Sequence, residues 1–402
     1  MDKVTAAVRA FYETYPYPSG DDALCDGYHG RLLLSYLERP QGAPRSLGVL
    51  EAGCGRGVNL SAVAARQQQD RFTGIDINRV AIDEAARTAA QRGLDNLDFQ
   101  VANLLDSASL PEVEEGYDVI LSYGVLHHLS DPVKGLRQLR ERLAPQGVIG
   151  LMVDGSYGRQ PLDRYLEALE IIEPAGLQRP SRRTSAQALA RAAEQGVFKG
   201  NYWQGTASVN EVEFADRCLH VHEMSYDITG LWRLLGAAGL RFIRWQESSD
   251  WCLEGISEEP QLAARLQALD PVDLYRVIER LAYRPKLTLV AARQEDSPRK
   301  APTRDEVSCL RFVVNPQLGI HRDEQGAAQW RLRCRPVSME PGGWEEEVVA
   351  EVGDSAEGLS ARTLLERLAE SGLDRDQGVE LIHRMHVREL LYSPHRHQQA
   401  LS

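Results

Sequence analysis

The sequence predicts an α/β protein whose main domain is a doubly wound, mostly parallel sheet. Between residues 47 and 153, short apolar runs alternate with amphipathic segments of helical period, which is the pattern of successive β–α units. The apolar runs, such as Val119–Ser122, have the length of strands, and Gly93 and Gly147 lie where the predicted helices should stop. Together, these observations favour a parallel sheet covered by helices.

The elements of this sheet follow in order along the chain. Five strands are predicted at Gly48–Ala52, Arg71–Asp76, Leu97–Val101, Tyr117–Ser122 and Val148–Val153. Apolar residues at helical spacing predict the intervening helices at Val58–Gln68, Arg79–Arg92 and Pro132–Leu143. A sixth and a seventh strand are expected at Leu240–Gln246 and Leu287–Ala292, after helices at Thr229–Ala238 and Pro271–Leu281.

The stretch after the fifth strand changes pattern. Arg159–Ile172 and Ser185–Gln195 have helical periodicity, and turns with Pro and Gly join them in place of further β–α units. We therefore expect a helical cap inserted at about residues 156–228 of a main domain that covers residues 41–295. Residues 1–40 are expected to form an N-terminal lid segment.

A separate C-terminal domain is predicted at residues 306–402, because residues 294–306 are rich in charge, Pro, Ser and Thr and break both periodicities. Strands are expected there at Leu310–Val314, Trp330–Cys334 and Glu347–Val352, helices at Ser360–Ser371 and Asp376–Arg388, and a final apolar strand at Leu390–Tyr392. Helices that follow β segments and end in a strand resemble a small α+β winged-helix module. Such a module would serve docking or dimerisation, so a homodimer is a possible assembly.

Composition and charge narrow the classes of partner. The 402 residues are 43% hydrophobic and have a net charge of −12, which disfavours nucleic acid as the main substrate. The apolar runs are too short to span a bilayer, and the N-terminus has no secretory signal, so we expect a cytoplasmic protein without membrane attachment. The six cysteines form no C-x-x-C pair, which argues against a disulfide framework and a structural zinc site.

The segment that carries most chemical information is the turn after the first strand. Glu51 is followed by Gly53, Gly55 and Gly57, and glycine is needed where the backbone turns sharply and approaches a ligand closely. This spacing differs from the G-x-G-x-x-G fingerprint, which places a pyrophosphate at a helix N-terminus. A carboxylate at residue 51 would disfavour a pyrophosphate and tolerate a cofactor with a cationic amino-acid tail.

An acidic residue, Asp76, ends the next predicted strand. A carboxylate at this place can accept hydrogen bonds from both hydroxyls of an adenosine ribose. Each element alone is weak, because a strand-end aspartate is more often a helix cap. Together, and in this order, they resemble the class I S-adenosylmethionine (SAM)-dependent methyltransferases, which have a Rossmann-like seven-stranded sheet.

The following segments extend this resemblance over about 110 residues. Asn103 stands where the family usually has an aspartate that binds adenine, and it keeps an acceptor oxygen. The stretches 117–129, which contains Val-Leu-His-His, and 143–147 resemble the family's fourth-strand motif and the turn before strand five. The resemblance implies SAM as cofactor, with a binding set of Tyr17, Glu51, Gly53, Gly55, Gly57, Asn59, Asp76, Ile77, Asn103, Leu104 and Ser122.

The N-terminal stretch Phe11–Pro18 resembles a Tyr-Pro-Tyr-Pro segment that covers the pocket in a subset of bacterial methyltransferases. That subset includes protein-methylating enzymes with a C-terminal winged-helix-like domain. An aromatic lid would exclude water and place π-electron density near the sulfonium. The alternative is a segment that only packs on the sheet.

Methyl transfer needs an aligned nucleophile and removal of its proton. His127 and His128 are the first candidates for the base, although one histidine of such a turn usually has a structural role. Residues expected near the acceptor are Tyr157 and Arg159 after strand five and Trp203, His222 and Tyr226 in the cap. We expect no metal site, because His220 and His222 lack a third ligand at fitting spacing.

The resulting hypothesis is a SAM-dependent methyltransferase that acts on an O or N nucleophile of a small molecule, peptide or protein. The alternative is a protein of the same fold that binds SAM as a sensor or scaffold without catalysis. The intact set of Glu51, the three glycines and Asp76 favours the enzyme. Formation of a methylated product distinguishes the two.

Overall fold

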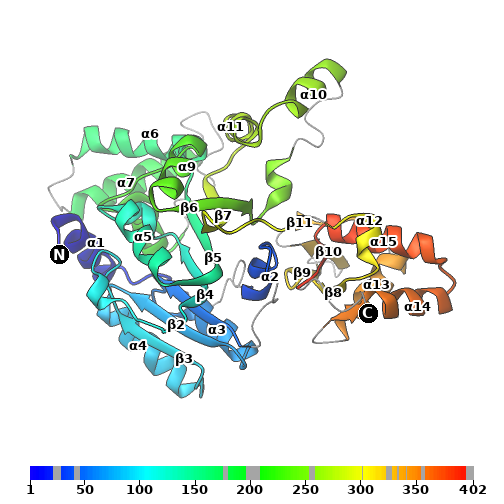
Figure 1. Ribbon diagram of the computed structural model, residues 1–402. Coiled ribbons are helices and arrows are strands. Elements are labelled where there is room, and N and C mark those ends of the chain that lie inside the picture. The colour runs from blue at the N-terminus through cyan, green and yellow to red at the C-terminus, as the bar shows by residue number, and fades with distance from the viewer. Residues whose placement is uncertain are drawn as a thin grey trace. The chain divides into compact units, whose positions relative to one another are not determined.

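The structure is a computed structural model that describes residues 1–20, 29–39, 46–174, 180–195, 209–252, 259–300, 302–322, 328–332, 335–340, 342–354 and 358–394. The chain forms two compact units (Figure 1). The first comprises Met1–Cys25 and Gly48–Gln294, and the second comprises Asp26–Leu47 and Glu295–Ser402. Each unit is therefore built from two separate stretches of the chain.

A seven-stranded sheet is the centre of the first unit, with the strand order β3-β2-β1-β4-β5-β7-β6. The first five strands pair in parallel, and β7 runs antiparallel between β5 and β6. The strands are β1 (Gly48–Ala52), β2 (Arg71–Asp76), β3 (Leu97–Val101), β4 (Tyr117–Tyr123), β5 (Leu143–Asp154), β6 (Leu240–Trp245) and β7 (Lys286–Arg293). This confirms the predicted Rossmann-like sheet of seven strands.

Helices between the strands bury one apolar side each. In α4 (Arg79–Gln91), the buried residues recur at helical spacing, and the side chain of Asn78 caps the first turn. The corresponding helices are α3 (Val58–Arg66), α5 (Pro132–Glu141), α9 (Ile228–Ala237) and α11 (Pro271–Leu281), with short 3-10 turns η1 (Ser107–Ser109), η2 (Leu126–His128) and η3 (Ser248–Trp251). The ends of β1, β2, β4 and β5 thereby open onto one edge of the sheet, where open α/β sheets bind ligands.

The segment after β5, which we call the cap segment, is helical. It contains α6 (Ser156–Ile172), α7 (Pro180–Glu194) and α8 (Glu211–Cys218), which share a small core that includes Tyr165, Leu169 and Phe214. A further helix, α10 (Pro260–Gln267), lies between β6 and α11 in the chain.

The N-terminal helix α1 (Lys3–Thr14) belongs to the first unit. Asp2 caps it by accepting a hydrogen bond from the Thr5 amide. The amide group of Asn78 donates to the Tyr12 carbonyl at 2.9 Å, which ties α1 to the start of α4.

The second unit has its own core and two three-stranded sheets, in the orders β11-β10-β9 and β12-β8-β13. Its elements are α2 (Gly30–Leu34), α12 (Arg304–Val307), β8 (Arg311–Val314), β9 (Leu318–Arg322), β10 (Ala328–Leu332), β11 (Arg335–Pro336), α13 (Trp344–Gly353), β12 (Leu359–Ser360), α14 (Ala361–Glu370), α15 (Arg375–Val387) and β13 (Leu391–Tyr392). The small α+β domain is confirmed. Its winged-helix character stays a prediction.

One predicted strand is wrong. Glu347–Val352 lies within the helix α13, although its valines favour a strand. Val348, Val349 and Val352 are the residues that this segment buries, and their spacing fits one side of a helix. Three glutamates in the first turn also favour the helix through its dipole.

Residues 29–39 pack within the second unit. The Glu38 amide donates to the Ser297 carbonyl at 3.0 Å, and the Arg299 amide donates to the Tyr36 carbonyl at 2.7 Å. Leu32, Leu33 and Leu34 are nearly inaccessible to solvent. Among the described residues, none of the helices has both the length and the apolar content needed to cross a membrane.

Candidate functional site

The glycine turn after β1 is possible only without side chains. Gly53 and Gly55 both have a positive φ, of 84° and 52°. A Cβ on Gly53 would collide with Val125, and one on Gly55 would collide with the Tyr17 carbonyl. The turn therefore packs between Val125 at the start of η2 and the Tyr17 carbonyl of the N-terminal segment, and the covering role of this segment stays a prediction.

Asp76 at the end of β2 organises this turn. Its carboxylate accepts hydrogen bonds from the amides of Gly55, at 2.9 Å, and Asn78, at 2.8 Å. Burial raises the pKa of Asp76, and these N–H donors oppose the rise. The carboxylate and the glycine turn are thus one connected structure at the ends of β1 and β2.

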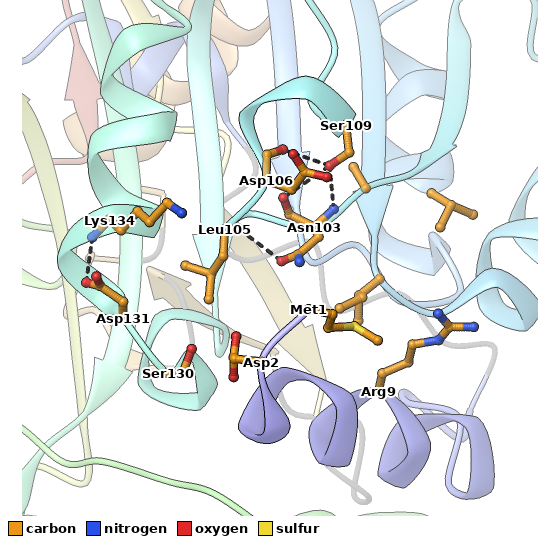
Figure 2. A pocket seen from close by; sticks show the side chains of 13 residues that line it. Met1, Asp2, Arg9, Asn103, Leu105, Asp106, Ser109, Ser130, Asp131 and Lys134 are labelled. Atoms are coloured by element: carbon orange, nitrogen blue, oxygen red, sulfur yellow. Dashed lines mark hydrogen bonds between the residues drawn. The ribbon is translucent and has the colours of Figure 1, made fainter.

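A cavity of about 680 Å³ lies between the N-terminus, the end of β3 and the start of α5 (Figure 2). The predicted residues Ile77 and Asn103 line it. The Asn103 Oδ1 accepts a hydrogen bond from the Leu105 amide at 3.0 Å, and Leu104 is buried but is not part of the lining. The other lining residues come from the N-terminus, the end of β3 and the start of α5: Met1, Asp2, Arg9, Val101, Ala102, Leu105, Asp106, Ser109, Ser130, Asp131 and Lys134.

Two polar atoms of the predicted cofactor set are buried without a hydrogen-bond partner among the described residues. They are the Asn59 Oδ1 on α3 and the Ser122 Oγ on β4. Buried polar atoms normally have hydrogen-bond partners. These two oxygen atoms are therefore available to form hydrogen bonds with a ligand at this edge of the sheet. Glu51 is also buried, with 5% of its surface exposed.

A second polar group lies at the ends of β4 and β5. His127 and His128 form η2, and the rings of the two residues lie 4.1 Å apart. The His127 Nε2 lies 3.6 Å from the Asp154 Oδ2 at the end of β5. The His128 Nδ1 lies 3.0 Å from the carbonyl of His222, a residue of the loop between α8 and α9 (residues 219–227). We call this loop the cap loop, and the contact places it against η2.

Arg159 on α6 joins two carboxylates of this group. Its guanidinium contacts Asp154 at 2.5 Å and also forms an ion pair with Glu223. Burial raises the pKa of Asp154 to about 6 and that of Glu223 to about 8, against the opposing effect of Arg159. Asp154 is therefore a proton acceptor of near-neutral strength.

The histidines have the opposite shift. Burial lowers the pKa of His127 to about 3, of His220 to about 2, and of His128 well below its ordinary value. These imidazoles are neutral at pH 7 and are weak proton acceptors. The catalytic role of His127 and His128 stays a prediction.

The other predicted acceptor residues differ in position. Tyr226 contacts this group through its backbone, because its amide donates to the Asp154 carbonyl at 2.8 Å. Tyr157 is partly exposed, and the Arg280 guanidinium lies 4.5 Å from the centre of its ring. Trp203 lies outside the described residues.

Sequence reasoning missed Tyr12, Asp154 and Asp216 as members of this group. The Tyr12 hydroxyl donates to Asp216 on α8 at 2.9 Å, and its ring packs against His220 and His128. Asp154 could have been found from its place at the end of a predicted strand. Tyr12 lies within the Phe11–Pro18 stretch, and Asp216 lies within a stretch that resembles the cap-closing region of the family, but no pattern assigned either residue a role in this group.

His127, His128 and Glu223 each offer one potential ligand atom to a metal ion, and these atoms lie within 4.8 Å of one another. This trio does not include His220 or His222, the two histidines that the sequence places two residues apart. It contains two neutral imidazoles and one carboxylate.

Comparison with known proteins points to one family. A family model described as a methyltransferase domain matches residues 50–149. An uncharacterized protein of Synechococcus is 30% identical over 295 residues, which cover 70% of this chain and 69% of that protein. A ubiquinone biosynthesis O-methyltransferase of Actinobacillus pleuropneumoniae is 28% identical over 120 residues, 29% of this chain and 50% of that protein.

Among solved structures, PKMT2 from Rickettsia typhi superposes with a TM-score of 0.68 at 14% identity, covering 94% of this chain and 77% of that one. Its complex with AdoHcy (S-adenosylhomocysteine) superposes with the same TM-score and covers 91% of this chain and 75% of that one. These likenesses extend over both units and concern the fold.

Proposed function

Since the chain belongs to the class I SAM-dependent methyltransferases, we propose that it methylates an amine of a small molecule, peptide or protein that binds beside Asp154. The single observation that carries this proposal is the buried group of Asp154, Arg159 and Glu223 at the ends of β5 and the cap loop. Oxygen nucleophiles are the second candidates.

The cofactor site is proposed to comprise the glycine turn, Asp76 and the cavity lined by Ile77 and Asn103. The residues fit an adenosine-containing group, because Asn59 and Ser122 have buried polar atoms without partners among the described residues and because the Asp76 carboxylate lies at the end of the neighbouring strand β2. When bound, SAM supplies a methyl group on a cationic sulfonium. Asp76 is proposed to accept the ribose hydroxyls, and Asn103 the adenine amino group.

The amine is favoured by the charges around the proposed acceptor position. Asp154, Asp216 and Glu223 are buried or half-buried carboxyl groups on three different elements, and Asp154, with a pKa raised to about 6, stays ionised at pH 7. The described cation that contacts two of them is Arg159. An acceptor that arrives as an ammonium ion would find compensating charge here, whereas a carboxylate acceptor would be repelled.

Asp154 is proposed as the group that removes the proton. Its pKa of about 6 leaves it ionised at pH 7 and close to the best strength for a general base. Arg159 holds its Oδ2 atom at 2.5 Å, so Arg159 is a positioning residue. The remaining requirement is alignment of the nucleophile within about 3–3.5 Å of the methyl carbon.

The test is a transfer assay with methyl-labelled SAM and matched acceptors. Amine and hydroxyl versions of the same small molecules, and peptides with and without free amino groups, would be compared. We expect label in the amine versions and a rate of labelling about 10²- to 10⁴-fold lower with Asp154→Asn. Label only in hydroxyl acceptors would reject the amine, and unimpaired transfer by Asp154→Asn would reject the base.

A further inference from the structure

The group next to Asp154 contains more histidine than proton transfer requires. Four imidazoles, from His127, His128, His220 and His222, gather between η2 and the cap loop, and the rings of His128 and His220 lie 3.8 Å apart. Ring nitrogens of three of them are buried without a hydrogen-bond partner among the described residues, namely His127 Nδ1, His220 Nε2 and His222 Nε2. Buried imidazole nitrogens without partners are uncommon and need an explanation.

The orientation of the first two rings leaves one lone pair of each available. The His222 carbonyl can only accept, so the Nδ1 of neutral His128 carries the proton and Nε2 holds the lone pair. In His127, Nε2 faces Asp154 at 3.6 Å, and Nδ1 is the buried nitrogen without a partner. Glu223 contributes a carboxylate that the chain brings to the same place.

Each of these three side chains also has a group behind it that fixes its orientation. Asp154 lies behind His127, the His222 carbonyl behind His128, and the Arg159 guanidinium behind Glu223. Metal-binding histidines almost always have a carboxylate or a carbonyl at their second nitrogen, and ligating carboxylates are themselves hydrogen-bonded. The arrangement therefore has the side chains that would bind a metal ion and also the groups that orient these side chains.

We propose that His127 Nδ1, His128 Nε2 and a Glu223 oxygen bind one divalent transition-metal ion of the zinc class. Two imidazoles and one carboxylate form a known set for zinc that leaves a fourth position open. One potential ligand atom of each of these three side chains lies within 4.8 Å of those of the other two, and an ion at about 2.1 Å from each ligand atom would draw the three atoms to about 3.4 Å apart. The open position would take water or a polar group of the acceptor.

The positive charge of the ion would also be balanced by the carboxyl groups around it. Asp154, Asp216 and Glu223 contribute three carboxyl groups from β5, α8 and the cap loop, and Arg159 is the cation in contact with two of them. A divalent ion at this place would meet carboxylates on more than one side. Metal binding does not require the reaction to take place, so it can be measured without it.

The experiment uses the full chain without a histidine tag, freed of metal by chelator and titrated with Zn²⁺ in a calorimeter. We expect one equivalent to bind, and Co²⁺ to give the visible absorption of a four- or five-coordinate ion. His128→Ala and Glu223→Gln should each lose more than about 100-fold in affinity, and Asp154→Asn about 10- to 100-fold. His321→Ala, which changes an exposed histidine on β9, is the matched control and should bind as the unaltered chain does.

Folding of each variant is checked by its affinity for S-adenosylhomocysteine, which should not change. The proposal is overturned if the metal-free chain binds no Zn²⁺, or if His128→Ala and Glu223→Gln bind it as tightly as His321→Ala does. The proposed function is tested separately by the labelled-methyl assay in excess chelator and with added Zn²⁺. Labelled product without any metal binding would reject the metal site and leave the methyltransferase assignment intact.

Discussion

At the scale of single residues, Asp76 has two roles that a substitution would remove together. It holds the amides of Gly55 and Asn78, and it is the proposed partner of the ribose. Asp76→Ala should therefore weaken binding of S-adenosylhomocysteine by about 100-fold or more, which corresponds to two charge-assisted hydrogen bonds. Calorimetry measures this loss. Asp98→Ala, which removes an exposed acid from β3, is the control, and equal affinity in both variants would reject the role of Asp76.

Gly55 gives a second prediction, because its backbone and its neighbours both exclude a side chain. Gly55→Ala should lose about 1–2 kcal/mol of stability from the left-handed conformation alone, and cofactor affinity should fall because the new methyl collides with the Tyr17 carbonyl. Gly236→Ala on α9 is the matched control, since its Cβ would meet no described atom within 4 Å. Thermal unfolding with and without S-adenosylhomocysteine compares the two. A Gly55→Ala protein that binds normally would contradict the close approach.

Asp154 sets the expected pH dependence of the reaction. The carboxyl group must be ionised to accept a proton, and its pKa is raised to about 6. Consequently kcat/KM should fall as the pH drops through 6 and should level off above about pH 7. A profile from pH 5 to 9 checks this limb. In Asp154→Asn the rate should drop by about 10²- to 10⁴-fold and the limb should vanish, so an unchanged limb would point to another group.

At the scale of elements, helix α1 connects the start of α4, next to Asp76, with α8 in the cap segment. The Tyr12 carbonyl accepts from Asn78, and its hydroxyl donates to Asp216 on α8. Tyr12→Phe leaves the desolvated carboxyl group of Asp216 without this donor. We therefore expect the free energy of unfolding to fall by about 1–3 kcal/mol and the KM for the acceptor to rise. Tyr15→Phe in the same segment is the control. If the two variants have equal melting temperatures and KM values, α1 has no part in holding the cap.

The elements also show where sequence patterns suffice and where they fail. The strands that carry Glu51 and Asp76 could be placed because each apolar run ends at a glycine or an acid, so local signals agree with the fold. The valines of Glu347–Val352 predict a strand, but the residues that this segment buries have helical spacing. β-propensity is a weak guide where packing against a core decides the conformation.

The candidate site divides in the same way. The cofactor residues lie within one continuous stretch of β–α units, where order along the chain fixes position at the sheet edge. The group of Asp154, Arg159 and Glu223 joins β5 to a loop beyond α8, and only tertiary packing of the cap brings its members together. Arg159 could be predicted from its place after strand five. The raised pKa of Glu223 could not, because it comes from burial.

At the scale of the whole molecule, the two units do not correspond to two continuous segments. Residues 29–39 pack with residues 297–299, so a chain that ends at Gln294 would keep the whole sheet but would expose Leu32, Leu33 and Leu34. We expect such a chain to bind S-adenosylhomocysteine within a few-fold of the full chain, because the glycine turn, Asp76 and the cavity all lie in the first unit.

The same truncated chain should aggregate, because Leu32, Leu33 and Leu34 would become exposed to water. Exposing a buried leucine side chain costs a free energy of about 1.5–3 kcal/mol. Light scattering on heating measures this, and a second chain in which Leu32, Leu33 and Leu34 are replaced by serine should stay dispersed while it binds equally well. If cofactor affinity instead disappeared in both truncated chains while both stayed folded by circular dichroism, the second unit would contribute to the cofactor site. If only the leucine chain failed, exposure of α2 would account for it, because the two proteins differ in no other residue.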